Sequence, residues 1–296
     1  AYRAATSLYG SDLPEVKLVS IGDVNAQFGE AAAKRFGFER HDADWRTIAD
    51  DPNIQAVSVV VANHLHREIV EGLLAAGKNV LCEKPLSDTL EDARAMVKAA
   101  NEAKSVARIG LTFLRNPAIA AIQQLIASGE LGKVLHFSGK YWADYSADPM
   151  NPIAWRYKGG MGTGALADVG SHISYVAEFI TGKPFSAVSG ARFVTAITER
   201  PVATGAVQGH GAAPVSDKFD SVENDDYAGF TAQFGDIAGS IEVSRVASGH
   251  PTSLGFEVYC EKGAARFTQA RNGEFELMVN EGPYGNRGFR TVQIGP

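Results

Sequence analysis

The stretch of sequence that decides the fold is residues 56–85, which read AVSVVVANHLHREIVEGLLAAGKNVLCEKP. Ala56–Ala62 is a continuous apolar run, which is typical of a parallel strand covered on both faces. His66–Ala76 carries apolar residues at helical spacing and ends at Gly77, and Asn79–Cys82 is a second short apolar run. This strand–helix–strand order predicts a parallel sheet with crossover helices.

The same alternation continues on both sides of this stretch. Before it, Val16–Ile21 is predicted as a strand and Ala26–Phe36 as a helix. After it, Thr89–Ala103 is predicted as a helix and Val106–Leu111 as a strand. Residues 1–113 are therefore predicted to form a doubly wound α/β domain of the Rossmann type.

A Rossmann domain begins with a strand and a Gly-rich turn that binds the pyrophosphate. Tyr2–Leu8 instead resemble the tail of a helix, so we expect that first strand and turn to lie upstream of Ala1. Asp23, directly after Val16–Ile21 and Gly22, then takes the position where an acidic side chain binds the ribose diol. The alternative is that Asp23 is an ordinary turn residue.

A second Gly-rich turn, GMGTGA at residues 160–165, matches the G-x-G-x-x-A spacing of a dinucleotide site. The residues before it are not a buried strand, and TGKP at 181–184 lacks the acidic residue expected about 20 residues later. We therefore interpret this turn as a flexible entry to a helix. His64 and His66 alternate at a helix start and do not converge, so no metal site is expected.

Beyond residue 113 the pattern changes to strands with few helices between them. Helices are predicted over Pro117–Ser128 and Gly164–Ile180, and Glu199–Ser221, rich in Gly, Ala and Pro, is predicted as a long surface loop. Residues 114–296 are therefore predicted as a second α/β domain with a large, mainly antiparallel sheet. The predicted strands are Val134–Trp142, Ala187–Thr195, Tyr227–Phe234, Gly239–Val246, Phe256–Cys260 and Ala264–Phe267.

The composition of the 296 residues excludes several classes of protein. The net charge of −6 is spread evenly, and no basic stripe is present that could neutralise nucleic-acid phosphates. No apolar run is long enough to span a membrane. The two cysteines, Cys82 and Cys260, suit a reducing cytosol and are expected to be buried. We therefore expect a cytoplasmic enzyme that acts on a small molecule.

Polar residues follow two of the predicted parallel strands. Asn63 and His66 follow the first strand of residues 56–85, and Glu83 and Lys84 follow the second. Ligands of open parallel sheets bind at this carboxyl edge. Taken alone, Glu83 and Lys84 could also be a solvated ion pair.

Asp168 and His172 lie four residues apart on a predicted helix, so their side chains share one face. A lysine, a carboxylate and an imidazole that converge on one cleft can hold a hydroxyl group and move its proton. The structural alternative for this pair is a hydrogen bond on the helix surface. Four further residues are expected to form the substrate wall or, alternatively, to pack within the sheet: Tyr141, Trp142, Tyr145 and Arg156.

The order of these motifs resembles the glucose–fructose oxidoreductase/inositol dehydrogenase/MocA family. The resemblance runs from Val59 to Pro85 and continues through SDTLEDARAMVKAANEA at 87–103, GELGKV at 129–134 and WRYKGGMGTGALADVGSH at 155–172. EKP followed by D-x-x-x-H after a Gly-rich turn is its specific signature. The resemblance implies an NAD(P)-dependent oxidoreductase that acts on sugars or polyols. It also implies a second domain that carries the substrate site and often an oligomer interface.

The resemblance also assigns roles to residues. The catalytic set is Lys84, Asp168 and His172. The cofactor set is Asn63, His66, Glu83, Lys84, Trp155 and Arg156, and Asp23 joins it because of its position after a predicted strand. The substrate set is Lys84, Asp168 and His172, and Tyr141 and Arg156 join it as residues of the expected substrate wall. Three departures stand out, since Val61-Ala62 replaces a Thr-Pro pair, Thr112 replaces an Asn, and Tyr175 replaces an Asp one turn after His172.

The resulting hypothesis is reversible oxidation of a secondary hydroxyl of a sugar or cyclitol. His172 takes the hydroxyl proton, Lys84 hydrogen-bonds the substrate oxygen, and NAD is preferred over NADP, although NADP stays possible. We expect a homodimer or homotetramer formed through the antiparallel sheet. Two rival hypotheses stay open, a redox-neutral NAD-dependent glycosidase and a sugar-responsive binding protein without catalysis.

Overall fold

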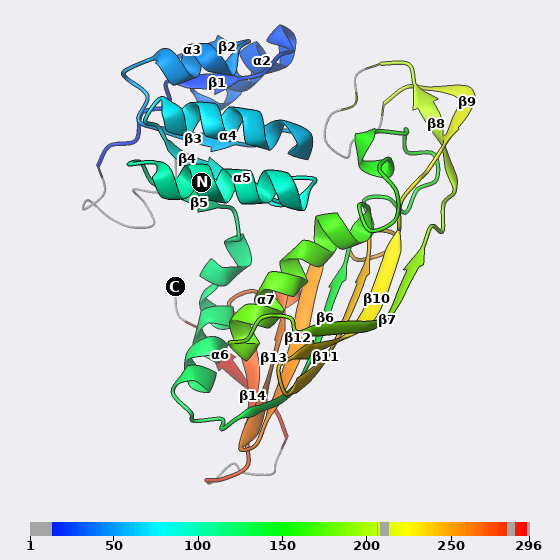
Figure 1. The fold of residues 1–296 in the computed structure, drawn as a ribbon. Coiled ribbons are helices and arrows are strands. Elements are labelled where there is room, and N and C mark those ends of the chain that lie inside the picture. The colour runs from blue at the N-terminus through cyan, green and yellow to red at the C-terminus, as the bar shows by residue number, and fades with distance from the viewer. Residues whose placement is uncertain (1–13, 206, 208–212, 283–287, 295–296) are drawn as a thin grey trace. The chain divides into compact units, whose positions relative to one another are not determined.

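The computed structural model describes residues 14–205, 207, 213–282 and 288–294. The chain divides into two compact units between Gly110 and Leu111, three residues before the predicted boundary (Figure 1). The predicted helix tail at Tyr2–Leu8 lies outside the described residues. Among the helices in the described ranges, none is long and apolar enough to span a membrane.

The first unit is a parallel α/β structure, as predicted. Its strands pair in parallel as β1–β2 and as β3–β4–β5. Helix α4 packs on β3 and β4, and α5 packs against α4, around a core that includes Val59, Leu73, Val80 and Met96. The elements are β1 (Ser20–Gly22), α2 (Ala26–Phe36), β2 (Arg40–Asp42), α3 (Trp45–Asp50), β3 (Ala56–Val59), a 3₁₀ turn (Asn63–Leu65), α4 (His66–Ala75), β4 (Asn79–Cys82), α5 (Leu90–Glu102) and β5 (Ala107–Ile109).

The ends of the predicted helices follow local chemistry. The side chain of Asn25 accepts a hydrogen bond from the backbone N–H of Phe28, which starts α2, and Gly37 ends it at φ 73°. Thr89 caps α5 by accepting from the N–H of Asp92. These caps depend on side chains within a few residues, so they can be read from the sequence.

Residues 40–50 form a strand and a helix that the apolar pattern does not predict. Strand β2 consists of Arg40, His41 and Asp42, and its parallel pairing with β1 holds it in the extended conformation. Asp42 accepts hydrogen bonds from Ser20 Oγ at 2.7 Å and from Arg40 Nε at 2.8 Å. Polar contacts between neighbouring strands stabilise this segment where an apolar run would otherwise be expected.

The second unit is built on an eight-stranded mixed sheet, and Figure 1 shows helices α6 and α7 along one side of it. The order is β15-β14-β13-β12-β6-β11-β10-β7, antiparallel throughout except for the parallel pair β6–β11. The elements of the sheet and its helices are α6 (Pro117–Ala127), β6 (Val134–Trp142), α7 (Ser171–Thr181), β7 (Ala187–Val194), β10 (Tyr227–Phe234), β11 (Ile237–Ser244), β12 (Ser253–Cys260), β13 (Gly263–Thr268), β14 (Glu274–Val279) and β15 (Arg290–Gln293). This architecture confirms the predicted mainly antiparallel sheet.

The surface loop predicted over Glu199–Ser221 is wrong at both ends. Glu199–Ala203 forms β8 and Val215–Ser221 forms β9, and the two strands pair as an antiparallel hairpin. The guanidinium of Arg200 is fully buried, donates to the carbonyls of Ser146 and Asp148, and lies 4.4 Å from the centroid of the Tyr157 ring. A buried cation on an aromatic face thus anchors the start of β8.

Candidate active site

The helix predicted over Gly164–Ile180 begins with a wider turn. Leu166–Gly170 form a π-helical turn that contains Asp168, and α7 follows directly with His172 in its first turn. Single π turns inside helices are frequent at functional sites. The prediction that Asp168 and His172 share one helix face assumed uniform α-helical spacing. The π turn, which contains Asp168, departs from that spacing.

The imidazole of His172 is held between aromatic rings of the same unit. Its Nδ1 lies 2.9 Å from the hydroxyl of Tyr175, which also accepts the backbone N–H of Phe113 at 3.3 Å. The ring stacks on Tyr141 with centroids 5.6 Å apart and meets Phe113 edge-on at 5.1 Å. These contacts fix both the plane of the imidazole and the partner of one ring nitrogen.

Asp168 is bound by the hydroxyl of Tyr145, which donates to its Oδ2 at 2.7 Å. Burial, reinforced by the nearby Asp168 carboxylate, raises the pKa of Tyr145 well above its ordinary value. Burial and the same carboxylate raise the pKa of Tyr141 to about 12. Both phenols therefore stay protonated near neutral pH.

Trp155 and Arg156 lie on a 3₁₀ turn, Trp155–Tyr157, with the Arg156 guanidinium 4.4 Å from the centroid of the Trp155 ring. Trp155 is 46% exposed, so it presents an aromatic face to solvent. The carbonyl of Arg156 accepts from Asn224 at 2.9 Å and from Arg245 at 3.1 Å. The turn is therefore anchored by its backbone, with Trp155 exposed and Arg156 half-buried.

In the first unit, the predicted residues follow the carboxyl ends of strands. Asn63 opens the 3₁₀ turn after β3, and Lys84 follows β4, which pairs with β3. Glu83 accepts the backbone N–H of Lys84 at 3.1 Å. Asp23 follows β1, and its Oδ1 accepts the N–H of Asn25 at 2.8 Å.

His66 begins α4, after the loop that follows β3, as the sequence predicts. Its side chain is fully buried, with Nε2 3.2 Å from the carbonyl of Val61 and Nδ1 3.1 Å from that of Pro85. The imidazole therefore links the loop after β3 to the loop after β4. His66 therefore supports the segment that carries Lys84, and its predicted contact with the cofactor stays a prediction.

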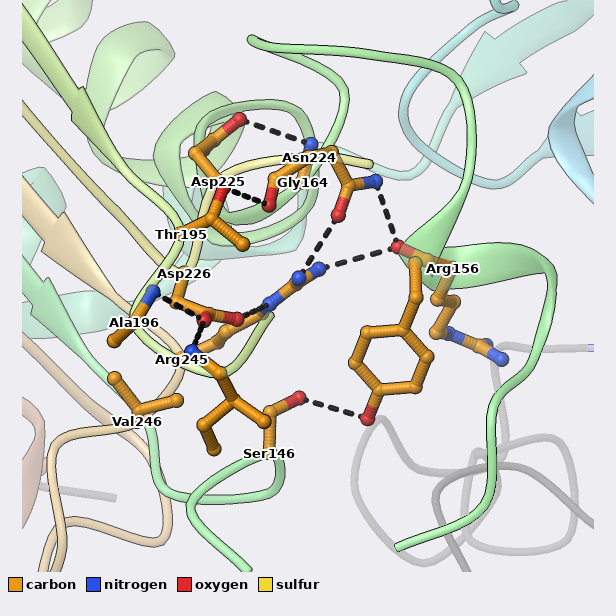
Figure 2. Close-up of polar contacts among 12 residues, drawn as sticks. Ser146, Arg156, Gly164, Thr195, Ala196, Asn224, Asp225, Asp226, Arg245 and Val246 are labelled. Carbon is orange, nitrogen blue, oxygen red and sulfur yellow. Dashed lines mark hydrogen bonds and ion pairs between the residues drawn. The ribbon is translucent and has the colours of Figure 1, made fainter. Parts of the chain in front are cut away.

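A buried polar cluster in the second unit was missed by sequence reasoning. Asn224, Asp225 and Asp226 stand side by side just before β10, and all three are fully buried (Figure 2). Asp226 forms an ion pair with the buried Arg245 at 2.8 Å. Consecutive polar residues before a strand are typical of a turn, so their burial had no signal of its own in the sequence.

The first unit is a parallel α/β structure with an acidic residue after β1, and the second unit holds a positioned histidine. This combination is typical of two-domain oxidoreductases that use a nicotinamide nucleotide. A model of the oxidoreductase family with an NAD-binding Rossmann fold matches residues 2–111, and a model of the GFO/IDH/MocA C-terminal domain matches residues 119–266. The chain belongs to the GFO/IDH/MocA oxidoreductase family.

Known relatives agree with this assignment. Levoglucosan dehydrogenase from Pseudarthrobacter phenanthrenivorans is 37% identical over 279 residues, which are 93% of this chain and 71% of that protein. 1,5-Anhydro-D-fructose reductase from Ensifer adhaerens is 36% identical over 167 residues, which are 55% of this chain and 49% of that protein. A solved complex of levoglucosan dehydrogenase with NADH and levoglucosan has a TM-score of 0.88 at 34% identity, covering 100% of this chain and 76% of that one.

These findings confirm the predicted family, the two-part fold and NAD as the cofactor. The residues of the first unit fit such a cofactor, because a carboxylate follows β1 and the next two residues, Val24 and Asn25, carry no cation for a 2′-phosphate.

Proposed function

We propose that this protein oxidises a secondary hydroxyl of levoglucosan or a closely related anhydro sugar, with NAD as the hydride acceptor. The observation that carries the proposal is the 37% identity to levoglucosan dehydrogenase over 93% of the chain. That similarity spans both units of the chain. The homologous structure with NADH and levoglucosan supports the same substrate class.

In the proposed chemistry, His172 is the general base. In the tautomer whose Nδ1–H donates to the Tyr175 hydroxyl oxygen, Nε2 carries the lone pair that takes the alcohol proton. Lys84 donates a hydrogen bond to the same oxygen and stabilises the negative charge that develops there. Bound NAD supplies the site that accepts the hydride.

Asp168 holds the substrate in this proposal. Its Oδ2 is already bound by Tyr145, and a carboxylate can accept further hydrogen bonds from sugar hydroxyls. Trp155 and Arg156 supply aromatic and cationic surface for the sugar ring, and the buried Tyr141 packs against His172. Asn63, Glu83 and Asp23 remain proposed contacts of the cofactor.

We also propose that the chain forms a homo-oligomer through the large sheet. On the face opposite α6 and α7, His136 and Tyr259 stack at 4.4 Å between ring centroids, and Leu135 of the same strand β6 is 52% exposed. An exposed sheet face with aromatic groups suits an interface between subunits. Sedimentation of the purified protein tests this proposal, and a monomer at micromolar concentration would contradict it.

The test of the proposed function is net NADH formation, followed by absorbance, when the complete protein is mixed with NAD and levoglucosan. The proposal expects stoichiometric NADH and a keto sugar. Hydrolysis of a glycoside with no net NADH would favour the redox-neutral glycosidase. Sugar binding by calorimetry without turnover would favour the non-catalytic binding protein.

A further inference from the structure

The backbone N–H groups of the Gly-rich turn before α7 donate hydrogen bonds to a side-chain carboxylate of the same unit, that of Asp225. The Oδ1 of Asp225 accepts the backbone N–H groups of Gly162 at 2.7 Å and Gly164 at 3.3 Å, and its Oδ2 accepts that of Leu166 at 2.9 Å. Clustered N–H groups at a helix start are the usual site of a phosphate or carboxylate. Three backbone N–H groups of this segment therefore donate to an internal carboxylate, and Figure 2 shows Asp225 beside Gly164.

The turn is shaped around this carboxylate. Gly162 has φ 89°, a left-handed conformation that side chains rarely adopt. A Cβ on Gly164 would lie 2.1 Å from the backbone oxygen of Asp225. That oxygen also accepts the N–H of Ala165 at 2.8 Å. Asp225 therefore contacts the segment through both its side chain and its backbone.

The two neighbours of Asp225 hold the adjacent loops. Nδ2 of Asn224 donates to the carbonyls of Arg156 and Lys158 at 2.9 and 3.0 Å. Asp226 accepts the N–H groups of Ala196 and Ile197 at 2.9 and 2.8 Å. The buried residues 224–226, directly before β10, therefore hydrogen-bond the Gly-rich turn, the turn at residues 156–158 and the backbone of residues 196 and 197.

We propose that Asp225 is a positioning residue for the active site. Its carboxylate fixes the point where the helical segment begins, two residues before Asp168 and six before His172. An amide at this position would turn N–H groups toward the backbone N–H donors of Gly162, Gly164 or Leu166, so the ionised carboxylate is required. The inference rests on the proposed roles of Asp168 and His172.

The test replaces Asp225 and returns a small carboxylate in solution. Asp225→Ala is expected to lower kcat/KM for the sugar by about 10²-fold, the scale reported for small misplacements of catalytic groups, with the KM for NAD unchanged. Formate, which can occupy the vacated N–H groups, is expected to restore part of the activity in a saturable way. Asp225→Asn keeps the volume but presents N–H groups to the same donors, so it is expected to lower kcat/KM without any response to formate; it serves if the alanine variant does not fold.

A matched control removes a helix cap elsewhere in the same unit. Asn116 caps α6 by accepting the N–H groups of Ala118 and Ile119. Asn116→Ala is expected to lower the melting temperature and to retain the wild-type kcat/KM. Addition of formate is expected to leave its activity unchanged. A folded Asp225→Ala protein with wild-type kcat/KM would overturn the inference, and so would a loss of activity equal to the loss of folded protein and insensitive to formate.

A readout without substrate separates this inference from the proposed function. The NMR signal of the His172 ring, assigned through its loss in His172→Gln, is expected to shift in Asp225→Ala and to return toward its original position with formate. If the wild-type protein does not oxidise levoglucosan, the proposed function fails while this measurement still decides the positioning role. An unchanged His172 signal in the folded variant would contradict that role.

Discussion

At the scale of residues, a phenol, that of Tyr175, lies beside the imidazole of His172. The Tyr175 hydroxyl lies 2.9 Å from Nδ1 and is itself held by the N–H of Phe113. A neutral hydroxyl orients the imidazole but adds no negative charge to stabilise its protonated form. We therefore expect the ring to be fixed by geometry and by aromatic packing.

Replacing His172 with Ala is expected to lower turnover by about 10²–10⁴-fold, the usual scale for loss of a general base. Binding of NADH, measured by fluorescence titration, should stay nearly unchanged. In the wild type, activity in the oxidative direction should rise with pH, because only the neutral imidazole accepts a proton, and the variant should lose this limb. Near-normal turnover with the same pH profile would rule out His172 as the base and leave Lys84 as the acceptor.

Replacing Tyr175 with Phe is expected to lower kcat by about three- to tenfold. The change removes one net hydrogen bond to the imidazole, of about 0.5–1.5 kcal/mol, while the ring packing stays. Tyr227→Phe is the matched control, because it removes a hydroxyl bound to Glu242 in the same unit. Equal kinetics for the two variants would show that the Tyr175 hydroxyl does not orient His172.

At the scale of elements, the sequence predicts most of what local chemistry decides. Helix α2 keeps its predicted bounds because a cap at Asn25 and a glycine at residue 37 set them. Strands β4 and β6 also keep their predicted bounds, since each is a short run of residues suited to a sheet. Lys84 and Asn63 could be assigned to the ends of strands for the same reason.

The rest depends on contacts between distant segments. Strand β2 is polar and exists because it pairs with β1, and β8 exists because Arg200 is buried against Tyr157. The carboxylate of Asp225 accepts N–H groups from residues about 60 positions earlier. The pattern of a short stretch of sequence cannot reveal contacts between residues so far apart. The only local signal was the Gly-rich turn itself, whose backbone N–H groups require an acceptor.

Gly164→Ala tests the packing of that entry. The added Cβ would lie 2.1 Å from the backbone oxygen of Asp225, which no side-chain rotation can relieve. We expect a loss of stability of about 1–3 kcal/mol or more in urea unfolding. Gly273→Ala is the control, because nothing lies within 4 Å of its added Cβ, and stability should change by less than about 0.5 kcal/mol. Equal stability of the two variants would contradict the described turn.

At the scale of the whole molecule, the first unit decides which nucleotide is used. Asp23 follows β1, and a carboxylate there binds ribose hydroxyls and repels a 2′-phosphate. The protein should therefore show a higher kcat/KM with NAD than with NADP. Asp23→Ser should lower the ratio of kcat/KM with NAD to kcat/KM with NADP. A clear preference for NADP in the wild type would contradict the role of Asp23.

The central claim is that this member of the GFO/IDH/MocA family oxidises an anhydro sugar with NAD through His172. The most direct measurement is the amount of NADH formed from NAD and levoglucosan by the wild type and by His172→Ala at equal folded concentration. The account predicts steady NADH formation by the wild type and a rate about 10²–10⁴-fold lower for the variant. Absence of net NADH with the wild type, or equal rates for the two proteins, would contradict it.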